Sequence, residues 1–341
     1  MEEEKRKYSI EEIANICNVS KATVSRVINH SPTGVGEETR KRVQTVIEKL
    51  NYRPNNLARS VATSRSQMIG LIVPDVSNFF YPKIIRSVTD YMNGKGYAVI
   101  IGNSDYNPEK EADQVLSMID KRVDGIILCS GVSNAVFLKD FKKYHVPLAL
   151  IGRAFDSSLS EASIMGDNEI GAYKSAKYLI DGGNRRIVYV EGNPKISGSI
   201  QRLKGYQRAL EEAKIAYDEK LVFSGEYSIE YGKEMADRLL DDQIEFDAVM
   251  TGSDLIAIGV VSGLIKRGVR IPEDKELIGF DNIELASVFN PSLTTISKPH
   301  YDMAQHISRQ LLNVIEGKKT SLTHTIVEPY LVVRETTRKR E

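Results

Sequence analysis

Seven short apolar runs recur through residues 67–341, and each has the length of one buried strand. Amphipathic segments such as 81–93 separate them. Continuous apolar strands that alternate with helices are typical of parallel sheets covered by helices on both faces. Because seven strands are too many for one small sheet, the pattern predicts an α/β body of two doubly wound lobes. The runs span 68–74, 97–102, 125–129, 147–151, 186–190, 248–251 and 277–280.

Polar and aromatic side chains cluster at or near the ends of several predicted strands, where parallel strands would bring them to one edge of a sheet. Amides, aromatic rings, carboxylates and arginines are the groups that a pocket uses to hold a polyhydroxylated ligand. Each of them could instead cap a helix or form a structural ion pair, and Asp254 in particular fits such a role. Their shared position favours a ligand cleft. The candidates are Asn78, Phe80, Tyr81, Arg153, Arg202, Ser253 and Asp281.

The first part of the chain has its own charge pattern. Between Lys5 and Ser66 there are 12 Lys and Arg against 5 Glu, although the net charge of the whole chain is zero. A basic head on a mildly acidic body indicates that the head meets a polyanion while the body does something else.

Two short helices are predicted at the start of this head. Ser9 is a suitable N-cap with Glu12 at the capping-box position, and Asn18 falls where a tight turn needs a positive φ. Ser20 then caps a second helix through Asn29, whose outer face is small, hydroxylic, amide or cationic. Such a face suits a helix in the major groove of DNA, although a solvated amphipathic helix or a plain helical hairpin would share the pattern.

A third helix is predicted to begin near Glu37 and Glu38 and to pack back on the first two. After it, Pro54 can start a short helix of just over two turns within 54–62. A helix so short is marginal alone, because nucleation is unfavourable and few hydrogen bonds follow it. We therefore expect a disordered linker in the absence of DNA, with the capacity to fold on DNA.

Three segments of the head resemble the LacI family of bacterial transcription regulators: 9–14, 19–29 and 51–55. The resemblance implies that the second helix enters the major groove and that the hinge helix pairs with its twin in a dimer, wedging a side chain into the minor groove. The wedge falls on Val61 where relatives carry Leu, so a shallower wedge is expected. By the same resemblance Lys21, Ala22 and Arg26 face bases, while Ser9, Thr23, Ser25 and Asn29 hold phosphates; Tyr52, Asn55 and Arg59 complete the DNA-binding set.

The body resembles the periplasmic sugar-binding fold that this family uses as an effector domain. Positions that line its cleft match Asn78, Phe80, Arg153, Arg202, Ser253 and Asp281. Three residues depart from the pattern: Gly152 replaces a frequent Asp, Ser253 a frequent Asn, and Lys298 a frequent Gln. Losing an acid and gaining a cation favours an acidic or phosphorylated sugar over a neutral one.

The domains expected are an all-α helix-turn-helix domain at 8–53, a hinge at 54–66, one lobe at 67–164 with 292–322, and the other at 165–291 with 323–341. The function expected is a ligand-responsive repressor that binds a pseudo-palindromic operator as a homodimer. The alternative is a small-molecule binding protein with no regulatory role. Whether a protein corepressor also binds is left open.

Other classes of protein are disfavoured. The five histidines form no recognisable catalytic motif, so no enzyme and no cofactor are expected. Cys17 and Cys129 stand far apart in apolar settings, which favours two reduced core thiols over a metal site or a disulfide. No apolar run approaches a membrane span and no signal-peptide pattern occurs, so a cytoplasmic protein without a membrane partner is expected.

Overall fold

The computed structural model describes residues 8–29, 31–52, 65–129, 137, 141–152, 160–318 and 323–340. The chain divides into two compact units, a head at Met1–Ser66 and a body at Gln67–Glu341. The predicted hinge helix, with Asn55, Arg59 and Val61, lies outside the described residues, and so does Arg153.

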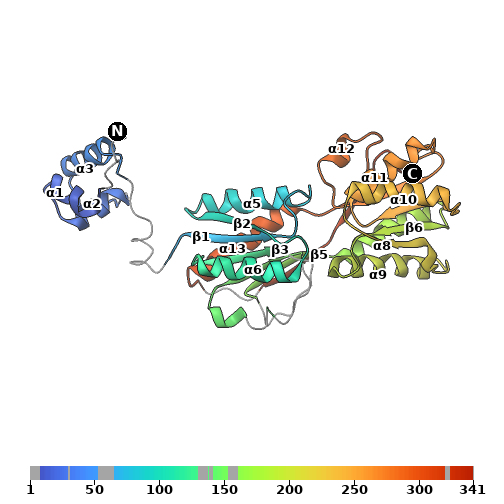
Figure 1. Ribbon diagram of the computed structural model, residues 1–341, viewed down its shortest axis with the longest axis horizontal. Coiled ribbons are helices and arrows are strands. Elements are labelled where there is room, and N and C mark those ends of the chain that lie inside the picture. Colours follow the sequence, from blue (N-terminus) through green and yellow to red (C-terminus); the bar gives the residue numbers. More distant parts are fainter. Residues whose placement is uncertain are drawn as a thin grey trace, which may run out of the picture. The chain divides into compact units, whose positions relative to one another are not determined.

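The head consists of α1 (Ile10–Ile16), α2 (Lys21–Ile28) and α3 (Glu37–Lys49) (Figure 1). The predicted capping box is confirmed, because Glu12 N donates to Ser9 Oγ and Ser9 N donates to Glu12 Oε2. Asn18 has a φ of 50°, and Ser20 Oγ caps α2 by accepting from Thr23 N. The buried side chains of the three helices form one small core: Ile13, Ala14, Cys17, Val24, Val27 and Val43.

The first lobe of the body is one six-stranded parallel sheet in the order β11-β5-β4-β3-β1-β2. Helices α5 and α13 pack on one face of this sheet and α6 packs on the other (Figure 1). The strands are β1 (Met68–Val73), β2 (Ala98–Asn103), β3 (Gly125–Cys129), β4 (Leu148–Ile151), β5 (Ala162–Gly166) and β11 (Thr323–Val327); the helices are α5 (Tyr81–Asn93), α6 (Pro108–Asp120) and α13 (His300–Ile315).

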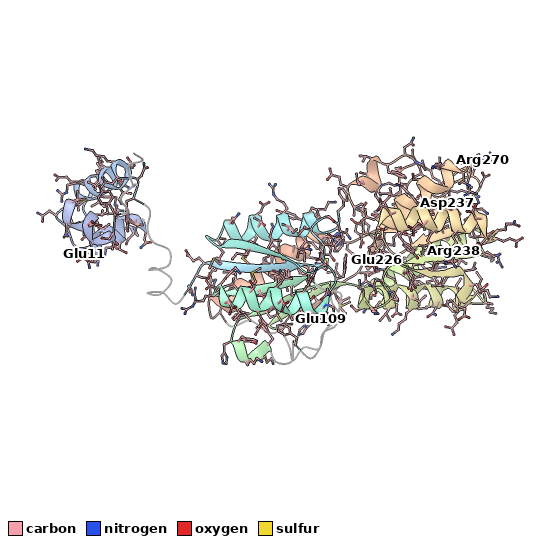
Figure 2. All side chains as sticks on the ribbon, in the orientation of Figure 1. Glu11, Glu109, Glu226, Asp237, Arg238 and Arg270 are labelled. Atoms are coloured by element: carbon pink, nitrogen blue, oxygen red, sulfur yellow. The ribbon has the colours of Figure 1, made fainter. Side chains whose placement is uncertain are left out.

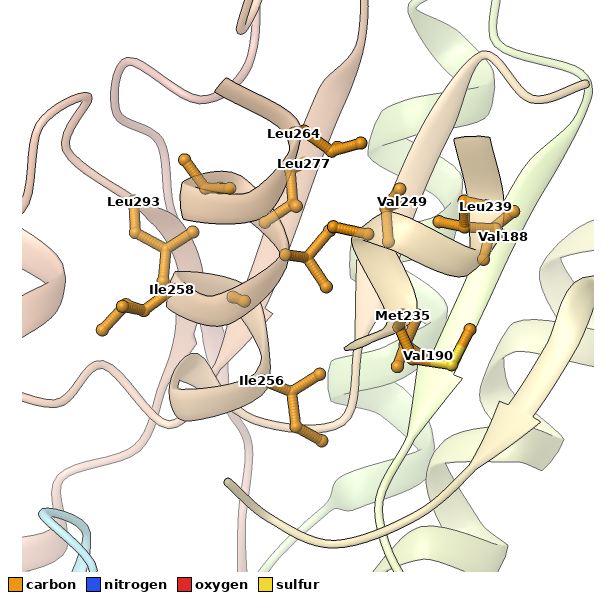
Figure 3. Close-up of a cluster of buried hydrophobic side chains, with 14 of the residues drawn as sticks. Val188, Val190, Met235, Leu239, Val249, Ile256, Ile258, Leu264, Leu277 and Leu293 are labelled. Atoms are coloured by element: carbon orange, nitrogen blue, oxygen red, sulfur yellow. The ribbon is translucent and has the colours of Figure 1, made fainter. Parts of the chain in front are cut away.

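The second lobe is also a six-stranded sheet, in the order β12-β10-β9-β8-β6-β7, with only β12 antiparallel among its described pairings. Helices α10 and α11 cover one face and α8 and α9 the other. Figure 3 shows the α10–α11 side of this core. The strands are β6 (Ile187–Glu191), β7 (Val222–Ser224), β8 (Ala248–Thr251), β9 (Glu276–Phe280), β10 (Thr294–Ser297) and β12 (Tyr330–Val332); the helices are α8 (Asn168–Asp181), α9 (Ser197–Glu212), α10 (Ile229–Asp241), α11 (Asp254–Lys266) and α12 (Leu285–Val288).

Helices α8 and α9 approach closely because α9 has glycine at the crossing. A Cβ atom on Gly205 would lie 2.1 Å from the backbone oxygen of Glu169. No side chain fits at that distance, so glycine is required for this packing.

Two predicted lobe boundaries are wrong. The boundary at 292 placed residues 294–297 in the first lobe, but they form β10 of the second sheet. The boundary at 323 placed 323–327 in the second lobe, but they form β11 of the first. Residues 323–332 form two strands, β11 and β12, which are separated at Pro329, a residue with no N–H to continue a ladder.

The chain therefore crosses between the lobes after β5, after β10 and after β11. Strands β5 and β11 are neighbours at one edge of the first sheet, and β10 and β12 are neighbours at one edge of the second. All three crossings thus begin at strands of these two edges, while β2 and β7 form the opposite edges.

Candidate ligand cavity and nucleic-acid interface

A cavity of about 90 Å³ lies between the lobes and is lined by residues of both. Seven of the eight predicted cleft residues line it, and the eighth, Arg153, lies outside the described residues. This volume is well below the 300 Å³ or more of a typical ligand pocket. The space between the lobes is therefore narrow. The predicted residues gathered there are Asn78, Phe80, Tyr81, Arg202, Ser253, Asp281 and Lys298.

Three charged side chains meet in this cavity. Lys298 Nζ lies 3.3 Å from Asp281 Oδ1, and Arg202 Nη2 lies 4.0 Å from the same oxygen. All three side chains are at most 11% exposed. Arg202 also donates to the backbone oxygen of Gly252, so its position is fixed from a second side.

The two cations, Arg202 and Lys298, also lie against aromatic rings. The Arg202 guanidinium lies 4.2 Å from the centre of the Phe280 ring, and Lys298 Nζ lies 4.8 Å from it. Lys298 Nζ is also 5.8 Å from the ring of Phe80, which belongs to the other lobe. Ring faces attract cations more strongly where water is excluded.

The pKa values of these groups are shifted by burial and by their neighbours. Burial lowers the pKa of Lys298 to about 8, although Asp281 opposes that shift. Burial alone would raise the pKa of Asp281, but Lys298 and Arg202 together outweigh it and lower that pKa. Burial, with Lys298 nearby, lowers the pKa of His300 to about 3, so this imidazole is neutral. At pH 7 the described lining thus carries two positive charges and one negative.

The backbone at Asp281 is unusual. Its φ is 108°, a region that residues other than glycine rarely adopt. This conformation follows directly after β9 and turns the carboxylate toward Lys298. Such strain occurs preferentially at functional sites, where the surrounding structure holds it in place.

Asn168 was missed by sequence reasoning and lies at the centre of the polar contacts. Its Oδ1 accepts from Arg202 Nη2 at 3.3 Å and from Lys298 Nζ at 3.4 Å, and its Nδ2 donates to Gln201. The signal available was its position just after a buried strand, the rule that found the other candidates. A Cβ on Gly166 would lie 2.2 Å from Lys298 Cδ, so glycine makes room there for the lysine stem.

Two tyrosines, also missed, stack across the cavity. The rings of Tyr106 and Tyr227 have centroids 6.1 Å apart and an interplanar angle of 28°. Tyr106 follows β2 and Tyr227 follows β7, so each comes from the sheet edge farthest from the crossings. The pair closes the side of the cleft opposite the three crossings between the lobes.

Two buried atoms of the lining have no hydrogen-bond partner among the described residues. They are Asp281 Oδ1, which has only its ion pairs, and His300 Nε2. An unpaired buried polar atom is unfavourable unless something else satisfies it. A ligand in the cavity could provide that partner.

Ser253 and Asp254 have structural roles at the start of α11. Ser253 Oγ accepts from Ile256 N and caps the helix, while the residue also lines the cavity. Asp254 accepts from Ile283 N at 2.8 Å and from Thr295 Oγ1. Burial raises its pKa to about 8, so this carboxyl is mainly protonated at pH 7. The structural role expected for Asp254 is confirmed.

The head presents a second candidate surface along α2. Lys21, Ala22, Arg26 and Asn29 are exposed on it, whereas Val24 and Val27 face the core. The hydroxyls are already oriented within the helix, because Thr23 Oγ1 bonds Ser20 Oγ and Asn29 Nδ2 donates to Ser25 Oγ.

The other two described candidates of the head come before and after this helix in the chain. Ser9 is exposed at the start of α1. Tyr52 packs against the core of the head, and burial raises its pKa. The exposed set of cations, hydroxyls and an amide has the chemistry that phosphates and base edges require.

A helix-turn-helix head joined to a two-lobed domain with a charged cleft has the architecture of a ligand-controlled transcription regulator. Residues 9–55 match the model of the bacterial regulatory proteins of the lacI family. Residues 66–335 match the model of periplasmic binding proteins and the sugar binding domain of the LacI family. The chain therefore belongs to the LacI family, and the predicted family and fold class are confirmed.

Similar proteins support this assignment over nearly the whole chain. Catabolite control protein A of Priestia megaterium is 35% identical over 325 residues, covering 95% of this chain and 97% of its own. The HTH-type transcriptional repressor PurR of Vibrio atlanticus is 33% identical over 330 residues, covering 96% and 98%. The solved structure of a CelR–cellobiose complex has a TM-score of 0.73 at 28% identity, covering 97% and 100%. These relatives are regulators, which confirms the expectation that the chain is not an enzyme.

No helix in the described parts of the chain is both long enough and apolar enough to cross a membrane.

Proposed function

We propose that this protein is a repressor that binds a pseudo-palindromic operator as a homodimer and releases or holds it in response to a small anionic sugar derivative. The observation that carries the ligand class is the charge of the cavity: Arg202 and Lys298 face one carboxylate, Asp281. A ligand with one negative charge would neutralise the excess positive charge, and its hydroxyls would find Asp281, Asn168 and His300.

The cavity volume sets a condition on binding. A hexose needs more space than about 90 Å³, so the lobes must open to admit it. The three crossings at one edge provide a hinge for such an opening. A ligand that prefers one lobe angle would then bias the pairing of first lobes in a dimer, and with it DNA affinity, reciprocally.

On the DNA side, a single head offers one short recognition helix, and a two-fold dimer doubles its reach over two half-sites. We propose the roles implied by the family for the exposed residues of α2 and for Ser9. The hinge roles of Tyr52, Asn55, Arg59 and Val61 are part of the same proposal. Replacing Val61 by Leu is expected to tighten operator binding through a deeper wedge, and unchanged or weaker affinity would contradict it.

One experiment tests both halves of the proposal. Binding sites are selected from random double-stranded DNA with the full chain, alone and with glucose, glucuronate or glucose 6-phosphate. Enrichment of a two-fold symmetric sequence supports the operator proposal, and the absence of any enriched sequence refutes it. A parallel thermal-shift series compares the same ligands, because glucose and glucuronate share a ring and differ in charge.

The Lys298→Gln variant is the control for the ligand class. Stabilisation of the wild type by glucuronate or the phosphate, reduced in the variant, supports an anion held by Lys298. Stabilisation by neutral sugars with no response to either anion would refute the anionic class while leaving the DNA-binding proposal intact.

A further inference from the structure

An exposed ion pair lies on the face of the head that is proposed to meet DNA. Lys21 is the first residue of α2, and its Nζ lies 2.8 Å from Oε2 of Glu11, in the first turn of α1. The two side chains are 56% and 63% exposed. Glu11 is labelled at the surface of the head in Figure 2.

The helix dipole favours Glu11 in the first turn of α1, but it does not explain the position of Lys21. Lys21 stands at the helix N-terminus, where the helix dipole disfavours a cation. Glu12 already completes the capping box of α1, so the cap does not need Glu11. Exposed ion pairs contribute little to folding, and a carboxylate close to DNA is repelled by phosphates.

The pair does present a hydrogen-bond donor and an acceptor next to each other. In the major groove a G·C base pair offers two neighbouring acceptors, guanine O6 and N7, beside one donor, cytosine N4. A lysine ammonium suits the guanine acceptors, and a carboxylate accepts from cytosine N4. An A·T pair separates its two acceptors by a donor, and the thymine methyl group occupies the space beside O4, so the match is poorer.

We propose that Glu11 is a specificity-determining residue that acts with Lys21. The ammonium of Lys21 binds guanine while the carboxylate of Glu11 accepts from cytosine N4, so the two side chains together select a G·C pair at one position of each half-site. This inference rests on the proposed DNA-binding function.

The experiment measures base preference with the full chain as wild type, Glu11→Gln, Glu11→Ala and Lys21→Met. Glu48→Gln is the matched control, because Glu48 is an exposed glutamate on α3 of the same head and its change removes the same charge. Each protein is used to select sites from random double-stranded DNA, and affinities are then measured for the four base pairs at every half-site position.

Wild type is expected to favour one C·G pair by about 10-fold or more over its alternatives, and Glu11→Ala to reduce that preference several-fold at this position alone. Glu11→Gln is expected to shift the preference toward adenine, because an amide pairs with adenine N6 and N7. Lys21→Met should weaken the guanine preference at the same position. Glu48→Gln should leave every preference unchanged.

The inference is overturned if wild type selects a defined operator and the Glu11 variants keep its base preferences at all positions. In that case the DNA-binding proposal survives. If wild type enriches no sequence, the DNA-binding proposal fails and the inference fails with it. Thermal unfolding of each variant distinguishes a loss of folding from a loss of base recognition. A purely structural role of Glu11 would change the unfolding temperature without changing base preference.

Discussion

Asp281→Asn is the most informative test of the charged cavity. The substitution keeps the shape of the side chain but leaves Lys298 and Arg202 buried without their carboxylate. At 3.3 Å and an effective dielectric constant of about 20, the attraction between Lys298 and Asp281 is roughly 5 kcal/mol before desolvation is subtracted. Breaking a buried pair by removing one partner typically destabilises a protein by about 3–5 kcal/mol. We expect a loss of about 3 kcal/mol at pH 7, because Lys298 can relieve part of the penalty by losing its proton.

The assay is a double-mutant cycle with Asp281→Asn, Lys298→Gln and the double variant, using urea unfolding of the full chain. Tyrosine fluorescence is a suitable signal, since fourteen of the sixteen tyrosines lie in residues 67–341 and the chain has no tryptophan. The double variant should be more stable than Asp281→Asn, with a coupling energy of about 2 kcal/mol.

A change of pH provides a second check. The pKa of Lys298 is lowered to about 8 by burial, so at pH 9 the amine is mostly neutral in the wild type. Removing Asp281 should then destabilise the protein less than at pH 7. If the single effects add within about 0.5 kcal/mol, or if Asp281→Asn has the same effect at both pH values, the reasoning about this ion pair is wrong.

Three further substitutions are predicted to change stability in urea unfolding. The pKa of buried His300 is about 3, against about 6.5 when unfolded, so the unfolded state takes up the proton first and the protein becomes less stable as the pH decreases from about 6.5 to about 3. Between pH 7 and pH 5 the wild type should therefore lose about 2 kcal/mol more stability than His300→Gln. Equal losses would contradict this reasoning. Gly205→Ala should destabilise by more than about 2 kcal/mol through the α8–α9 clash, whereas Gly198→Ala on the same helix, with nothing nearer than 3.5 Å, should be neutral or slightly stabilising. Arg340→Ala should destabilise by about 2 kcal/mol, because it removes a 3.0 Å partner from fully buried Glu276; a change under about 0.5 kcal/mol would show that the other bonds to Glu276 suffice.

The features that the sequence predicted correctly depend on short-range chemistry. A cap and its box partner lie three residues apart, so Ser9 and Glu12 could be identified directly. Asn18 could be placed because few residues tolerate a positive φ. Cleft residues after long apolar strands, such as Asp281 after β9, followed from the rule that parallel strands end at a common edge.

The features that were missed depend on distant parts of the chain. Tyr227 follows β7, which has only three residues and therefore no detectable periodicity. Strand β10 contains Thr294 and Thr295, whose hydroxyls are buried because Thr337 and Asp254 satisfy them from 43 and 41 residues away. A local pattern contains neither partner, so this strand could not be assigned to its sheet.

The division of the cores also sets the order in which the protein can fold during synthesis. The core of the head uses residues 8–52, one continuous stretch at the start of the chain. Both sheets of the body need strands and helices that come after residue 293, namely α13 and β11 in the first and β10 and β12 in the second. Neither lobe can complete its sheet until those segments have left the ribosome, whereas the head can fold while most of the body is still being made.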